Sequence, residues 1–235
     1  MYRKIIVALV AVAAVSVGLV APVAGASAPT RANPQKVCQA IASQPDSPKQ
    51  ELKAIRLAQS GNVAALKPAL VAMEKAAQKA VKTGKSAPIE TKAYNANLTQ
   101  VFAFAYEECA DQQIEAIARD YSYEGIPSTL EAGSFAIKMV NEGAEDHEIG
   151  IAKVAESDTR STQEIIDAVI ATPQGQDPEG ITFVTGGYAP KGTTGYVFGD
   201  LESGRYLYLC SIDVAGGPKG HTHALEGMFG GFTVA

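Results

Sequence analysis

The sequence predicts two parts: a small all-α helical bundle over residues 27–119 and an all-β Greek-key sandwich with one short inserted helix over residues 120–235. Composition is the first observation, because Ala, Gln, Lys, Leu and Glu dominate the first part and short alternating stretches broken by Gly and Pro dominate the second. Charge is the second. The first part has twelve Lys/Arg against eight Asp/Glu, a net charge of +4, and the second has six against seventeen, a net charge of −11.

The amino terminus, residues 1–26, has the pattern of a signal peptide. Tyr2-Arg3-Lys4 carries positive charge, an apolar stretch rich in Ala and Val runs from Ile5 to Val20, and small residues follow at Ala24-Gly25-Ala26. The alternative is an uncleaved membrane anchor, for which the apolar stretch is short. We therefore expect an exported protein, secreted or in the cell envelope, without stable membrane insertion after cleavage.

The first part contains clear signals for the starts and ends of helices. Asp46-Ser47-Pro48 predicts a helix start, and Gly61-Asn62 predicts its end. A second helix is expected from about Val63 to Lys82, closed by Thr83-Gly84-Lys85, and a third over Ile89 to Arg119. We find no catalytic constellation in this part and do not expect an enzyme.

The three cysteines divide unevenly between the two parts. Cys38 and Cys109 fall in the helical part, and Cys210 falls in the β part. Three pairings are possible with one cysteine left over, and the division into parts favours a Cys38–Cys109 disulfide. An exported protein retains disulfides, and the chain-entropy model gives a loop of about 70 residues a stabilisation of about 4 kcal/mol.

The second part alternates between short strands and turn signals. This pattern predicts a sandwich or a Greek-key barrel. Strands are expected at Tyr121–Tyr123, Phe135–Val140, Ile149–Val154, Ile181–Val184, Thr194–Phe198, Arg205–Ser211 and Phe229–Val234, with a helix over Ser161–Ala171.

Potential metal ligands gather near the carboxyl terminus. Cys210, His223 and Met228 offer a thiol, an imidazole and a thioether within nineteen residues, and soft ligands of this kind hold copper. A strand places the side chains of alternate residues on one face, so the thiol is expected to point inward. A second imidazole must come from elsewhere, from His147, while His221 competes with His223. Taken singly, these residues are also consistent with a buried inert thiol, surface histidines and a core methionine.

Three stretches of the second part resemble the cupredoxins, the family of plastocyanin and azurin. They are Tyr121-Ser-Tyr-Glu-Gly-Ile-Pro127 with Asn141-Glu-Gly-Ala-Glu-Asp-His147, Gly204-Arg-Tyr-Leu-Tyr-Leu-Cys210, and the run His223 to Val234 that contains Met228. The resemblance covers about residues 120–235. It implies one mononuclear copper site with His147, Cys210, His223 and Met228 as ligands, one-electron transfer, and a redox protein as partner.

Two features depart from that family. Twelve residues separate Cys210 from His223, where the family has two to four, although the extra length costs only about 1.2 kcal/mol in loop-closure entropy. Acidic residues also flank His147, and their charge favours an exposed imidazolium. The alternative function is therefore a metal-free structural or partner-binding module of the cell envelope. Its acidic surface argues against nucleic acid as a partner.

Overall fold

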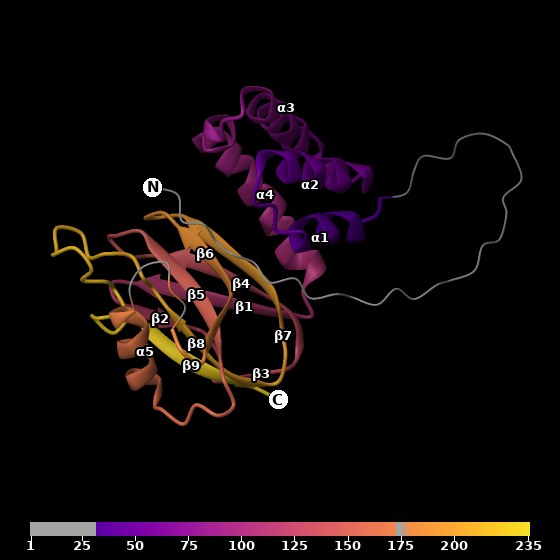
Figure 1. Ribbon diagram of the computed structural model, residues 1–235. Helices are drawn as coiled ribbons and strands as arrows, with labels where there is room; N and C mark the ends of the chain where they lie inside the picture. The colour runs from indigo at the N-terminus through magenta and orange to yellow at the C-terminus, as the bar shows by residue number, and fades with distance from the viewer. Residues whose placement is uncertain (1–31, 173–175, 177) are drawn as a thin grey trace, which may run out of the picture.

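The computed structural model describes residues 32–172, 176 and 178–235, and Figure 1 shows its elements. The expected signal peptide, residues 1–26, lies outside these residues. No helix within the described ranges has the length and apolar character needed to cross a membrane.

Helices form the amino-terminal part, as expected. Ser47 caps the second helix by accepting a bond from the Gln50 N–H, and Pro48 lies in its first turn. The third helix ends at Gly84, whose φ of 66° is left-handed. The helices are α1 (Gln35–Ala42), α2 (Pro48–Ser60), α3 (Lys67–Thr83) and α4 (Lys92–Cys109), with single 3₁₀ turns at Ala64–Leu66 and Ala87–Ile89.

The expectation of helix up to Arg119 is wrong at its carboxyl end. Helix α4 stops at Cys109, and Gln112–Arg119 is strand β1. Buried residues alternate along it at Ile114, Ala116 and Ala118, and β1 pairs parallel with a strand of the sandwich. The β structure therefore begins at Gln112 and not at residue 120.

The rest of the chain is the expected β-sandwich with one inserted helix. One sheet has the order β2-β1-β4-β7, and the other has the order β3-β9-β8-β5-β6. The strands that follow β1 are β2 (Ser122–Glu124), β3 (Thr129–Leu130), β4 (Gly133–Asn141), β5 (His147–Val154), β6 (Ile181–Ala189), β7 (Thr194–Leu201), β8 (Gly204–Leu209) and β9 (Phe229–Val234). Helix α5 (Thr162–Ala171) covers the second sheet, where Ile165 and Ile166 pack with Val154 and Leu207.

The predicted disulfide between Cys38 and Cys109 is present, and it joins α1 to α4. Cys210 is a buried free thiol. Helices α1 to α4 lie together on one side of the sandwich and α5 lies on the other (Figure 1).

Candidate metal centre

Three side chains from distant parts of the chain meet at one end of the sandwich. His147 is the first residue of β5, Cys210 directly follows β8, and His223 lies in the loop before β9. Leu209, the last residue of β8, pairs antiparallel with Gly150, near the start of β5, and with Phe229, the first residue of β9. The start of β5, the end of β8 and the start of β9 therefore share one edge, and the sheet register brings the three residues together.

The geometry of this group suits a metal ion. The ligand atoms of His147, Cys210 and His223 all lie within 4.8 Å of one another. The two Nδ1 atoms are 3.1 Å apart, and Cys210 Sγ is 3.3 Å from His223 Nδ1. All three residues are 0% exposed. A buried thiol and two buried imidazoles that converge in this way form a ligand set that fits copper.

The long spacing between Cys210 and His223 is absorbed by a hairpin. The N–H of Val214 donates to the carbonyl of His221 over 2.8 Å, and Ile212 accepts from the N–H of His223 over 2.8 Å. The extra residues therefore extend outward, and both ends of the loop return to the same place. The insertion lengthens the loop without moving His223 away from the thiol.

Met228 and His221 differ in their relation to this group. Met228 is buried; its N–H donates to the His223 carbonyl and its own carbonyl accepts from the Cys210 N–H, each over 3.0 Å. It also belongs to the same hydrophobic cluster as Cys210. His221 is 38% exposed and its Nε2 lies 2.5 Å from Glu226 Oε1. It is therefore His223, not His221, that joins the group.

Each buried imidazole also contacts a carboxylate that we did not predict. His147 Nε2 lies 2.8 Å from Asp120 Oδ1, and His223 Nε2 lies 3.1 Å from Glu145 Oε2. The ring of Tyr121 packs on that of His223 with centroids 4.9 Å apart. Asp120 directly follows β1. The sequence therefore indicates that Asp120 lies at the end of a strand only once Gln112–Arg119 is recognised as β1.

The expectation that acidic neighbours would leave His147 exposed is wrong. Asp146 bonds Tyr188 and the N–H of Lys191, and Glu148 accepts from the N–H of Ser211 over 3.2 Å. These two carboxylates therefore point away from the ring. Burial, the largest influence, lowers the pKa of His147, although the nearby Asp120 opposes it.

The two carboxylates are held in the ionised form, whereas the thiol is held in the neutral form. Burial opposes the ionisation of Asp120, but bonds from the Ala144 N–H, His147 and the Glu145 N–H outweigh it and lower its pKa. The Ala215 N–H is the largest cause of a lowered pKa at Glu145. Burial raises the pKa of the Cys210 thiol to about 11. A bound metal ion would displace that proton.

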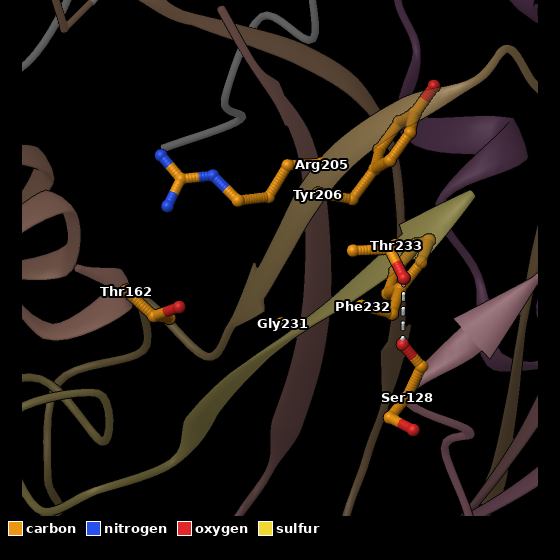
Figure 2. Close-up of a pocket in the computed structure, with 7 residues that line it drawn as sticks. All are labelled: Ser128, Thr162, Arg205, Tyr206, Gly231, Phe232 and Thr233. Atoms are coloured by element: carbon orange, nitrogen blue, oxygen red, sulfur yellow. Dashed lines mark hydrogen bonds between the residues drawn. The ribbon is translucent and has the colours of Figure 1, made fainter. Parts of the chain in front are cut away.

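None of the three residues of the candidate metal centre lines the pocket of about 230 Å³ that Figure 2 shows. Its one charged side chain, Arg205, already donates to the carbonyls of Asp158 and Arg160 over 2.7 and 2.6 Å. Thr233 Oγ1 bonds the Ser128 carbonyl over 3.5 Å (Figure 2). These bonds tie Arg205 and Thr233 to the protein itself, and we assign the pocket no function.

The chain was compared with known proteins. No protein-family model and no curated protein matches it. Among solved structures, auracyanin B is 19% identical, aligned over 55% of this chain and 91% of its own, with a TM-score of 0.39. Auracyanin A from Chloroflexus aurantiacus, described as a "blue" copper protein, is 21% identical over 52% of this chain and 97% of its own, with a TM-score of 0.34. Azurin from Methylomonas sp. strain J is 13% identical over 53% and 97%, with a TM-score of 0.34.

The strand order and the buried group at one edge define the fold of this part. Two sheets enclose one core, and the sheet register brings together two imidazoles and a thiol. The part of the chain from β1 to β9 is a β-sandwich that carries this group at one edge.

Proposed function

We propose that the protein is an exported copper-binding electron carrier with one mononuclear site formed by His147, Cys210, His223 and Met228. The observation that carries the proposal is the convergence of two Nδ1 atoms and one Sγ within 4.8 Å, all in side chains that are 0% exposed. The thiol, imidazole and thioether donors support the choice of copper, and auracyanin A, to which the chain is similar, is described as a "blue" copper protein. A redox protein is the corresponding partner.

The protein's own residues would hold the ligands at fixed positions through a reaction cycle. Bound copper would supply the one-electron couple between Cu(II) and Cu(I). Cys210 would bind as a thiolate, after its proton is displaced. Backbone hydrogen bonds link the candidate ligands, from Cys210 to Met228 and from Met228 to His223, each over 3.0 Å. Little rearrangement is then needed on electron transfer, and burial keeps water out of the site.

Copper loading followed by absorption spectroscopy tests this proposal. Stoichiometric Cu(II) should produce an intense visible band from sulfur-to-copper charge transfer, and Cys210→Ala should abolish it. His223→Ala should also weaken binding and shift the band. The matched control is His221→Ala, because this imidazole lies two residues away on the exposed hairpin and should leave the spectrum unchanged.

Each other result has a definite meaning. If the purified protein binds no copper and His223→Ala leaves its stability unchanged, the metal-free structural or partner-binding function is correct instead. If copper binds only as colourless Cu(I), the protein delivers or stores copper and the electron-transfer proposal is wrong.

We also propose that the chain is organised as two domains after export. The hydrophobic cluster of the helical part contains no residue of the sandwich, which supports a separate helical bundle closed by the Cys38–Cys109 disulfide. That disulfide and the sequence of residues 1–26 support an oxidising, extracytoplasmic location. Detection of the mature protein outside the cytoplasm, cleaved near Ala26, would test this location.

A further inference from the structure

The hydrogen bonds around the two imidazoles fix where their protons lie. An ionised carboxylate can only accept hydrogen bonds. Asp120 Oδ1 faces His147 Nε2 over 2.8 Å and Glu145 Oε2 faces His223 Nε2 over 3.1 Å, so both Nε2 atoms must carry hydrogen. In a neutral ring the other nitrogen is then a bare lone pair. Both Nδ1 atoms then face the space that they share with Cys210: they lie 3.1 Å apart, and His223 Nδ1 lies 3.3 Å from Cys210 Sγ.

The two carboxylates are themselves held in place. Asp120 accepts from the N–H of Ala144 over 2.8 Å and from that of Glu145 over 3.4 Å. Glu145 accepts from Tyr121 OH over 3.0 Å and from the N–H of Ala215 over 2.7 Å. Ala215 lies in the hairpin inserted between Cys210 and His223. The insertion therefore supplies a bond that anchors one of the carboxylates.

We propose that Asp120 and Glu145 are positioning residues that set the imidazole tautomers. They also favour a divalent over a monovalent ion, an inference that rests on the copper site proposed above. Together with the Cys210 thiolate they surround the centre with three negative charges. Each of these charges attracts Cu(II) more strongly than Cu(I) in proportion to ionic charge. The carboxylates thus lower the reduction potential of the centre below that of the same ligands without them.

Glu145→Gln isolates the charge. The glutamine oxygen can still accept from His223 and Ala215, while its NH₂ can donate to the Tyr121 hydroxyl. Mutation of an outer-shell partner typically weakens metal binding about 10–100-fold. We expect a loss in this range for Cu(II) and a tenfold smaller loss for Cu(I), which corresponds to a rise in potential of about 59 mV.

Glu226→Gln is the matched control, because it makes the same exchange on a carboxylate that bonds the exposed His221. It should leave both affinities and the potential at their wild-type values. Circular dichroism of each variant checks that the fold is retained. If wild-type protein shows the charge-transfer band and Glu145→Gln behaves like Glu226→Gln, the role of Glu145 is wrong while the copper site stands.

Asp120→Asn tests the tautomer in metal-free protein. The N–H of Ala144 requires an acceptor, so the asparagine oxygen should face it and the asparagine NH₂ should face His147 Nε2. His147 must then accept at Nε2 and carry its hydrogen on Nδ1, which blocks the ligand position. Two-bond ¹H–¹⁵N correlation spectra should report hydrogen on Nε2 of both rings in wild-type protein and on Nδ1 of His147 in the variant.

The two measurements separate the two proposals. Hydrogen on Nδ1 in the metal-free wild-type protein would overturn the positioning role whatever the copper experiments give. Failure of the wild-type protein to bind copper would overturn the proposed function, and the preference for a divalent ion with it, even if the tautomers are as expected.

Discussion

At the scale of single residues, the centre depends on a position without a side chain. Gly143 lies between β4 and β5, and a Cβ added there would overlap both Asp120 Oδ1 and His147 Nε2. We expect Gly143→Ala to push this pair apart, to lower the free energy of unfolding by about 1–3 kcal/mol, and to weaken copper binding. Thermal unfolding of the metal-free protein and copper titration measure the two effects.

A glycine in strand β5 provides the control for that substitution. A Cβ at Gly150 would meet its nearest atoms at 3.7 Å, which is ordinary contact. Gly150→Ala should therefore leave the copper site intact. Equal losses of copper affinity in the two variants would show that the effect comes from replacing a glycine in general and not from displacing the Asp120–His147 pair.

The candidate ligands could be found from the sequence because cysteine and histidine are rare in it, with three of each. Their carboxylate partners could not. Asp120 precedes His147 by 27 residues, and only the fold brings them together. Sequence neighbours were equally misleading, because adjacent residues leading into a strand point in different directions. Of the acidic residues around His147, Asp146 faces Tyr188, whereas Glu145 faces the other imidazole.

At the scale of elements, the loop between β5 and α5 is held by one carboxylate. Asp158 Oδ2 lies 2.6 Å from the Arg160 guanidinium, which lowers the pKa of Asp158 from its ordinary 3.8 to about 2. Because the pKa is lower in the folded state, this carboxylate stabilises the fold above about pH 4, and its contribution is lost as the pH falls toward 2.

Asp158→Asn should remove that pH dependence. We expect the melting temperature of the variant to lie below that of wild-type protein at neutral pH, and the difference to shrink as the pH falls from about 4 to about 2. Asp200→Asn, which removes an exposed carboxylate from β7, is the control and should run parallel to wild-type protein. A difference that stays constant with pH would contradict the proposed source of the stability.

Helix and strand signals in this sequence are strongest where caps or turn residues accompany them. Ser47 and Gly84 located the start of α2 and the end of α3 correctly. The segment Gln112–Arg119 has no such signal, and its Ile and Ala residues fit both a helix face and an alternating strand. Pairing with β4 decides between them, and the sequence of β1 alone does not contain that information.

At the scale of the whole molecule, helix α4 contacts both the helical core and strand β7 of the sandwich. Helix α4 directs Val101 into the helical core. On another side it places Phe102 against Phe198 of β7, with ring centroids 5.5 Å apart, and Tyr106 against Tyr196 at 6.1 Å. The sequence predicts this helix but not the division of its apolar residues between two partners, because periodicity gives the direction of a side chain and not its neighbour.

This contact should make the helical part and the sandwich unfold together. Phe102→Ala removes aromatic packing between them, and we expect it to lower stability by about 2 kcal/mol and to separate their unfolding transitions. Phe104→Ala is the matched control, because this half-buried ring packs within the helical core. It should destabilise the helices without changing the aromatic contact between α4 and β7. Far-ultraviolet circular dichroism and hydrogen exchange of strand amides follow the two parts during the same thermal transition. If the two signals remain coincident in Phe102→Ala, or separate equally in Phe104→Ala, the aromatic contact does not couple the two parts.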